Sequence, residues 1–212
     1  MKYQDLSKFS MPPNFRRAST FKVQLWWCVQ ASLFKWSPQF LYCFRAFLLR
    51  LFGAKVGKSV VIRPTVTVTY PWNVTIGDYA WIGDDVVLYS LGKIKIGDHA
   101  VVSQRSYLCT GDHDHTQIDF SIRGHQIVVE NEAWVATDVY IAPNVTIGRG
   151  AVIGARSSVF KDMPEGYICL GSPCKPIKYY FTELTSLQSS QELANTQVKW
   201  HSGLQSKVMT SE

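Results

Sequence analysis

Acidic residues are scarce in the first quarter of this 212-residue sequence, and so are long uncharged runs. Residues 1–53 hold eight lysines and arginines against a single acidic residue, Asp5, a net charge of +7. The whole chain carries +6, so residues 54–212 carry −1. The longest uncharged run of this basic segment, residues 23–34, has 12 residues. A membrane span needs about 18 to 20 apolar residues, so the sequence predicts none in this segment.

Paired cysteines are lacking as well. The chain has five cysteines, an odd number, without a CxxC spacing or a disulfide-like framework. This pattern is typical of a reducing compartment. The order of charged, apolar and cleavable residues that marks a secretory signal is not visible, and we expect a cytoplasmic protein. A composition of 46% hydrophobic and 13% aromatic residues excludes a disordered chain.

An aliphatic residue recurs every six positions from Val56 onward. Glycine often follows it, and a small or branched residue stands four positions after it. This hexapeptide repeat predicts a parallel β-helix in which three repeats close one triangular coil and the aliphatic residue points inward. The fifteen inward positions are Val56, Ile62, Val68, Ile76, Ile82, Leu88, Ile96, Val102, Leu108, Val129, Val135, Ile141, Ile147, Ile153 and Val159.

Interruptions of the repeat follow Val68, Leu88 and Leu108, each after three repeats. We therefore expect all of them to leave the prism at one corner, and we expect about five coils. Glycine and small residues are expected where the backbone turns tightly. The repeat stops after Val159, at a segment that contains Pro164.

The sequence divides into a basic helical arm (residues 1–53), the β-helix (54–163) with an inserted loop (109–128), and a C-terminal segment (164–212) with a polar tail. Ser37-Pro38 is expected to separate two apolar helices in the arm. The arm has two interpretations, which are compatible: a cap on the open end of the prism, or an amphipathic segment of residues 20–53 on the inner face of an anionic membrane. Nucleic acid is not an expected partner, because the positive charge is spread thinly over apolar helices.

The inserted loop holds three of the five histidines, His113, His115 and His125. Long ordered loops in a solenoid are usually functional. A histidine titrates near neutrality and can serve as a general base. A solvent-exposed loop histidine without a role is the simpler alternative.

Several motifs occur together in one order. They are 51–57 (LFGAKVG), 70–73 (YPWN), 103–104 (SQ), 108–114 (LCTGDHD), 133–136 (AWVA) and 171–178 (GSPCKPIK). Together with the repeat, this set resembles the hexapeptide-repeat acyltransferases, and more fully the colanic acid biosynthesis acetyltransferase-like sugar O-acetyltransferases. The resemblance runs from about Phe9 to Lys178 and implies a mainly β fold, a left-handed parallel β-helix, assembled as a homotrimer with active sites between subunits.

The resemblance implies acetyl transfer from acetyl-CoA to a sugar hydroxyl in surface or exopolysaccharide synthesis, by direct attack without a covalent enzyme intermediate. The family's catalytic histidine falls on His113. Either Asp112 or Asp114 is expected to orient its ring. His115, two residues on, is the competing base and otherwise a substrate contact.

The resemblance also implies binding residues. For acetyl-CoA they are Trp134, Thr137, Ala155, Phe160, Lys161, Lys175 and Lys178. For the acceptor, a nucleotide sugar or a lipid-linked sugar, we expect Tyr89, Ser90, Ser103, Gln104 and His115. Lysines suit the CoA phosphates, although Tyr179 stands where many relatives carry arginine.

Two other classes of protein stay open. Three histidines and two aspartates in one loop are compatible with a zinc enzyme of the γ-carbonic anhydrase type, although no metal is expected from the surrounding motifs. A β-helix that binds no CoA would be a non-catalytic scaffold.

Overall fold

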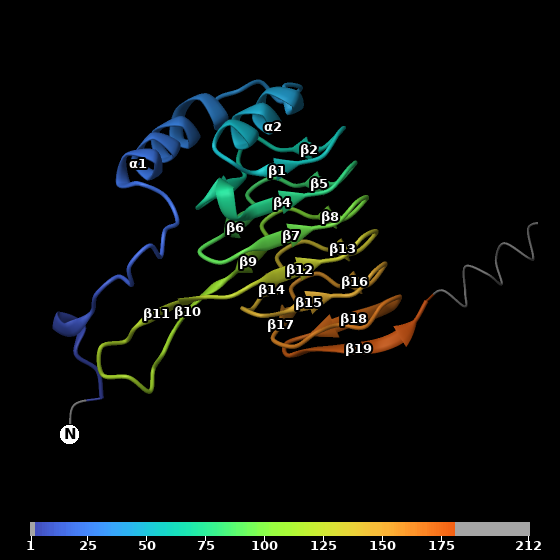
Figure 1. The fold of residues 1–212 in the computed structure, drawn as a ribbon. Coiled ribbons are helices and arrows are strands. Elements are labelled where there is room, and N and C mark those ends of the chain that lie inside the picture. Colours follow the sequence, from blue (N-terminus) through green and yellow to red (C-terminus); the bar gives the residue numbers. More distant parts are fainter. Residues whose placement is uncertain (1–2, 181–212) are drawn as a thin grey trace, which may run out of the picture. The chain divides into compact units, whose positions relative to one another are not determined.

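The structure, a computed structural model, describes residues 3–180; a helix expected near residues 183–193 and the polar tail beyond it lie outside this range. Short parallel strands wind into a β-solenoid with helices over its N-terminal end (Figure 1). The predicted mainly β fold with N-terminal helices is confirmed.

Three sheets form the walls of the prism, and their strands are parallel from one coil to the next up to β18 (Tyr167–Gly171). Sheet A contains β1 (Lys55–Val56), β4 (Val74–Ile76), β7 (Ile94–Ile96), β12 (Ile127–Val129) and β15 (Thr146–Ile147). Sheet B contains β2 (Val61–Ile62), β5 (Trp81–Ile82), β8 (Val101–Val102), β13 (Trp134–Val135), β16 (Val152–Ile153), β18 (Tyr167–Gly171) and β19 (Cys174–Tyr179). Sheet C contains β3 (Thr67–Val68), β6 (Val87–Tyr89), β9 (Tyr107–Cys109), β14 (Tyr140–Ile141) and β17 (Ser158–Val159).

The inward residues are those that the six-residue period predicts. Val56, Ile76, Ile96, Val129 and Ile147 are partners in one continuous register along sheet A. Fourteen of the fifteen predicted positions are buried, and Val56, in the first coil, is partly buried. The prism therefore stacks these aliphatic side chains in columns, and none of the fifteen carries a reactive group.

The solenoid continues beyond the five coils expected. Met163 forms a bridge to Ile147 in sheet A, and β18 pairs with β16 so that Cys169 lies beside Ile153. Both Met163 and Cys169 are buried. Met163 and Cys169 thus belong to a sixth, partial coil that contains Pro164, and the expectation that the repeat ends at Val159 was wrong.

The glycines of the repeat allow the backbones of successive coils to lie close together; they are not the residues at which the backbone turns. A Cβ on Gly83 would lie 2.7 Å from the backbone nitrogen of Gln104 in the next coil, and one on Gly57 2.6 Å from that of Asp78. Most left-handed corner positions carry non-glycine residues instead, among them Asp85 and Arg105, and Gly150 is an exception. The expected reason for these glycines is therefore corrected.

The arm consists of α1 (Thr20–Val29), the π-helical turn η2 (Gln30–Phe34) and α2 (Tyr42–Leu51). Ser19 caps α1 by accepting a hydrogen bond from the Lys22 amide at 3.3 Å. The break between the helices contains Ser37-Pro38, as predicted. Two short 3₁₀ turns, η1 (Leu6–Lys8) and η3 (Pro71–Asn73), lie outside these helices and the three sheets.

The arm caps the first coil on all three walls. Trp26 donates its indole N–H to the Val68 carbonyl of β3 at 2.7 Å, and Arg45 donates Nε–H to the Ile62 carbonyl of β2 at 2.6 Å. Arg50 donates to the Val56 carbonyl of β1 at 2.9 Å. These strands have no preceding coil to pair with, so side chains satisfy groups that would otherwise be an open sheet edge.

Candidate active site

A two-stranded hairpin leaves the prism where sheet C passes to sheet A (Figure 1). Its antiparallel strands are β10 (Gly111–His113) and β11 (Ile122–Gly124), and His113 pairs with Ile122. Residues 3–19, here called the N-terminal strap, reach the tip of this hairpin, where the Asp5 amide donates to the Ile118 carbonyl at 2.7 Å. The inserted loop is thus a structured element with His113 on its first strand.

His113 is held by the far side of its own hairpin. Its ring stacks on Phe120 with centroids 4.2 Å apart and planes 7° apart. Its Nδ1 lies 2.8 Å from the Phe120 carbonyl oxygen. Because a carbonyl only accepts hydrogen bonds, Nδ1 carries the proton in the neutral ring. The lone pair is then on Nε2, the nitrogen that can take a proton from a substrate.

The aspartates beside His113 do not contact its ring, and this corrects their expected orienting role. Arg123 donates to both carboxylate oxygens of Asp112 at 3.0 Å and approaches Asp114 at 3.4 Å. Asp114 also accepts from the amide and hydroxyl of Thr116. The two carboxylates therefore brace the hairpin, and the orienting acceptor is a backbone carbonyl that no sequence motif marks.

These contacts stabilise the ionised form of the Asp112 and Asp114 carboxyl groups. Burial acts to raise the pKa of Asp112, but the Arg123 guanidinium and the nearby His125 outweigh it and hold the pKa below its usual value. The Thr116 hydrogen bonds, with Arg123, lower the pKa of Asp114. Both groups are thus anionic at neutral pH, in ion pairs.

The other two loop histidines differ in setting. His125 lies where β11 returns to the prism; its Nε2 is 3.1 Å from Asp112 and its amide donates to the Thr110 carbonyl at 2.7 Å. This geometry supports a structural role. His115 is exposed in the loop between β10 and β11.

Phe9 of the N-terminal strap lies beside His113, with ring centroids 6.2 Å apart and tilted by 53°. Substituting Phe9→Ala removes one neighbour of the imidazole. We expect kcat to fall by about tenfold, because a reacting group that is displaced from its productive position lowers the rate. The KM for the acyl donor should change little. Steady-state kinetics measures this. Phe21→Ala, at an exposed side chain of α1, is the matched control. Wild-type kinetics in Phe9→Ala would show that the strap does not position His113.

The expected acceptor residues do not form one group. Ser90 is fully buried, and its hydroxyl accepts from the Tyr70 amide and donates to the Tyr70 carbonyl. It offers no surface to a sugar, so this expectation is corrected. Tyr89 lies at the base of the hairpin, next to Gly111.

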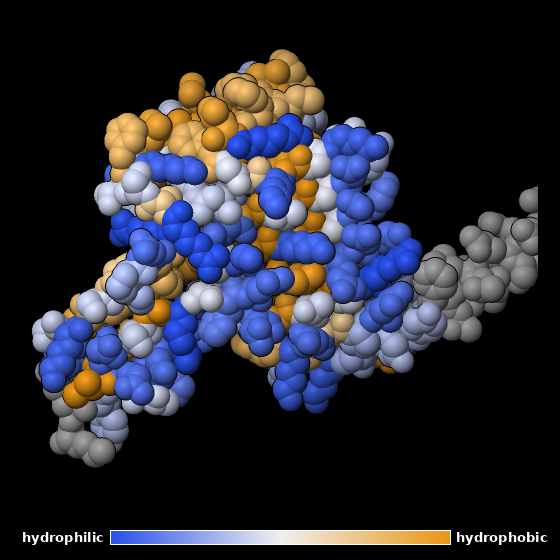
Figure 2. Space-filling model, viewed as in Figure 1, coloured by the Kyte–Doolittle hydropathy of each residue, from blue (hydrophilic) through white to orange (hydrophobic). Residues whose placement is uncertain are grey.

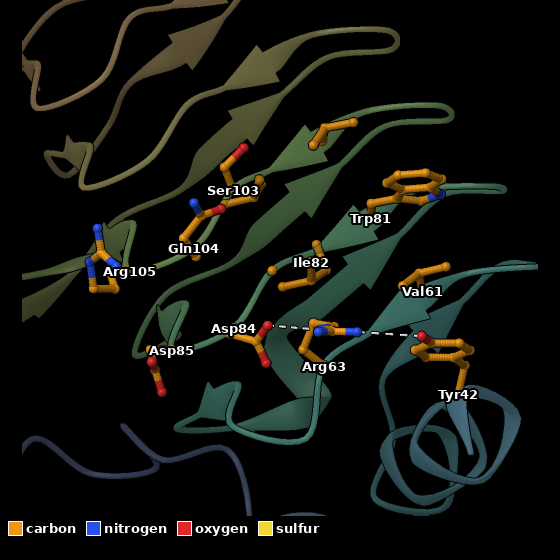
Figure 3. Close-up of a pocket in the computed structure, with 13 residues that line it drawn as sticks. Tyr42, Val61, Arg63, Trp81, Ile82, Asp84, Asp85, Ser103, Gln104 and Arg105 are labelled. Carbon is orange, nitrogen blue, oxygen red and sulfur yellow. Dashed lines mark hydrogen bonds and ion pairs between the residues drawn. The ribbon is translucent and has the colours of Figure 1, made fainter. Parts of the chain in front are cut away.

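Ser103 and Gln104 line a groove on sheet B with a volume of about 720 Å³ (Figure 3). Trp81 forms an apolar part of its wall, and Arg63 lies between Tyr42 and Asp84. Arg63 Nε donates to Asp84 at 2.8 Å, and this hydrogen bond raises the pKa of the guanidinium. The sequence analysis did not predict this ion pair between Arg63 and Asp84, which lie 21 positions apart.

Some of the residues expected to bind the donor lie next to this groove. The Trp134 indole N–H donates to the Ser103 hydroxyl at 3.0 Å, and the Thr137 hydroxyl donates to the Gln104 carbonyl at 3.0 Å. Arg156, next to Ala155, donates its amide to the Thr137 carbonyl one coil earlier. Trp134, Thr137 and Ala155 thus follow one another along sheet B and its corner with sheet C. Lys161, Lys175 and Lys178 are exposed.

Phe160 belongs to a different group, an aromatic ladder on the outside of sheet C. Its members are Tyr89, Tyr107, Tyr140 and Phe160, with successive centroids 6.0, 6.2 and 5.9 Å apart. Burial and the neighbouring Cys109 raise the pKa of Tyr140 to about 12, so its phenol stays protonated. Tyr107 and Tyr140 each precede an inward aliphatic residue, and this outward position in the repeat could have identified the ladder from sequence.

One chain does not bring all these residues together. The His113 hairpin leaves at the corner between sheets C and A, whereas the groove with Ser103 and Trp134 lies on sheet B (Figure 1). Among residues 3–180, no three histidine, cysteine or acidic side chains are grouped to hold one metal ion. The single chain therefore places His113 and the groove on different sides of the prism.

A hexapeptide-based β-solenoid with a histidine on an inserted hairpin is the architecture of a hexapeptide-repeat transferase. The family model described as bacterial transferase hexapeptide (six repeats) matches residues 126–161. The chain is 62% identical over 175 residues to the Escherichia coli K12 protein named "Putative colanic acid biosynthesis acetyltransferase WcaF", covering 82% of this chain and 96% of that one. The chain belongs to the hexapeptide-repeat acetyltransferase family.

Solved structures agree in fold. A maltose O-acetyltransferase from Clostridium difficile 630 superimposes with a TM-score of 0.69 at 27% identity, covering 75% of this chain and 86% of that one. A hexapeptide-repeat acetyltransferase from Vibrio cholerae, solved with acetyl coenzyme A, also gives 0.69 at 22% identity, covering 75% and 87%. The acetyltransferase class predicted from sequence is confirmed.

Proposed function

We propose that this enzyme transfers an acetyl group from acetyl-CoA to a sugar hydroxyl in the synthesis of a surface or extracellular polysaccharide. The observation that carries the proposal is His113, whose Nδ1 is committed to the Phe120 carbonyl and whose Nε2 is left as a base. The name of the 62% identical relative supports the pathway, and that of the maltose O-acetyltransferase supports a sugar acceptor.

In the proposed reaction, Nε2 of His113 accepts the proton of the sugar hydroxyl while its oxygen attacks the thioester carbonyl. The tetrahedral intermediate expels the CoA sulfur, which takes the proton from the imidazolium. The Phe120 carbonyl keeps Nδ1–H in place throughout and so holds the productive tautomer. The products are an acetyl ester and CoA thiol, and no covalent enzyme intermediate is needed.

We also propose that the site is completed in a homotrimer. The hairpin and the Trp134 groove lie on different walls of one prism, and a neighbouring copy can supply one to the other. In this arrangement Trp134, Thr137, Ala155, Phe160, Lys161, Lys175 and Lys178 bind acetyl-CoA, and Tyr89, Ser103, Gln104 and His115 contact the acceptor.

Thiol release from acetyl-CoA tests the proposal directly. We expect turnover that depends on a sugar or sugar nucleotide, measured with a panel of acceptors, and an acetyl ester in the product by mass spectrometry. If the folded protein neither binds nor consumes acetyl-CoA, the enzyme proposal fails and the scaffold alternative takes its place. Zinc in the purified protein with hydration of CO₂ would favour the carbonic anhydrase alternative instead.

A further inference from the structure

The arm presents an apolar surface on the side that faces away from the prism. Figure 2 shows hydrophobic residues gathered over α1 and α2, at the top of the view. The most exposed are Trp36 at 80%, Phe21 at 76% and Phe40 at 75%. We call this surface the outer arm face, and it consists of Phe21, Leu25, Leu33, Trp36, Phe40, Phe47 and Leu51.

Capping the prism does not account for these residues. The cap uses the opposite side of the same helices, where Trp26, Phe34, Leu48 and Leu49 are buried against the first coil. A helix that is apolar on both sides needs a second apolar partner. Within the part of the chain that the structure describes, nothing covers the outer arm face. Contiguous apolar surface of this kind marks an interaction site.

The charges around this surface identify the chemistry of the partner. No aspartate or glutamate occurs from residue 6 to residue 77. Lys35 is exposed between Phe34 and Trp36, whereas the guanidinium of Arg50, beside Leu51, is bonded to the Val56 and Gly57 carbonyls of the first coil. A second copy of this face would bring like charges together, which disfavours self-association through it. An anionic partner with an apolar interior satisfies both the charge and the apolar side chains.

We propose that the outer arm face binds the surface of an anionic lipid bilayer and lies in its interfacial layer. Apolar and aromatic side chains with flanking cations are the features of interfacial helices. No helix among residues 3–180 has the length and hydropathy to cross a membrane, so the contact is peripheral. The inference concerns where the protein binds and is independent of the acetyl-transfer reaction.

Vesicle co-sedimentation of the full chain tests the lipid contact. The probes are vesicles of phosphatidylcholine alone and of phosphatidylcholine with phosphatidylglycerol. We expect binding to the anionic vesicles that weakens with salt, since exposed charges are screened. Lys35→Glu should weaken this binding by about tenfold, because two units of charge change near the surface. The matched control Lys95→Glu, an exposed cation of β7 on sheet A, should bind like wild type.

The apolar contribution is tested with the double variant Trp36→Ser/Phe40→Ser, which we expect to lose vesicle binding. Ile118→Ser, at an exposed apolar residue of the hairpin, is its control. Circular dichroism and thermal unfolding establish that each variant is folded. Absence of wild-type binding to anionic vesicles, or equal binding to neutral ones, would overturn the proposal. A drop in oligomeric mass of the double variant without loss of vesicle binding would assign the face to a second copy.

Discussion

Replacing His113 with alanine is expected to lower kcat by on the order of a hundredfold or more, because general-base catalysis contributes about 10² to 10⁴. The side chain supplies the only step in the proposed reaction that removes the hydroxyl proton. Its ring is held by the Phe120 carbonyl at 2.8 Å and by stacking at 4.2 Å, so the lone pair of Nε2 has a fixed direction. Thiol release from acetyl-CoA with a reactive acceptor measures the effect.

The matched control is His115→Ala. This histidine lies two residues along the same hairpin, is exposed and is a proposed acceptor contact. Its loss should therefore raise the KM for the acceptor and leave kcat within a few-fold of wild type. Unfolding temperatures of both variants should match the wild type, since neither side chain belongs to the core cluster. Full activity in a folded His113→Ala enzyme, with loss of activity in His115→Ala, would move the base to His115.

Replacing Arg45 with methionine is expected to destabilise the fold by about 3 kcal/mol or more. This guanidinium is fully buried and donates to the Ile62 carbonyl at 2.6 Å, the Gln39 carbonyl at 2.6 Å and the Ser37 hydroxyl at 2.7 Å. Burial lowers its pKa, which shows the cost of holding the charge there. Methionine keeps much of the volume and leaves the acceptors without donors. Urea denaturation measures the difference in the free energy of unfolding.

Arg149→Met provides the comparison for that measurement. Arg149 pairs with Glu132 at 3.0 Å, but the Arg149 side chain is 58% exposed and the Glu132 side chain 50% exposed. Exposed ion pairs contribute little, so the unfolding midpoint of this variant should stay close to wild type. Equal effects of the two substitutions would mean that the cap does not depend on Arg45.

The six-residue period predicted the prism because the inward positions of a β-solenoid recur at a fixed spacing along the sequence. A shift of that spacing at any coil would bury a residue that belongs on the outside. Leu108 and Val129 could be assigned to neighbouring rungs although a long insertion separates them. The sixth coil escaped prediction because its inward residues are Met163 and Cys169, which do not fit the aliphatic pattern. Pro164 between them also imitates an end of the repeat.

Of the candidate site, the sequence predicted the residues of the motif but not the contacts that they make. The position of His113 follows from the TGDHD motif, but its partner depends on the pairing of two strands across a turn. The carbonyl of Phe120 is a backbone group, and any residue there would supply it. The burial of Ser90 and the ion pairs of Asp112 likewise arise from contacts between distant segments, which a spacing pattern does not encode.

The corner between sheets C and A has one more consequence. Register continues unbroken from β7 to β12 and from β9 to β14 although the His113 hairpin is inserted between Leu108 and Val129. The rungs on either side of the insertion therefore stack in the same register as rungs that follow one another without an insertion. The insertion is accommodated at one corner of the prism, so a change in the length of its tip is expected to leave the stacking of the coils, and the groove on sheet B, unchanged.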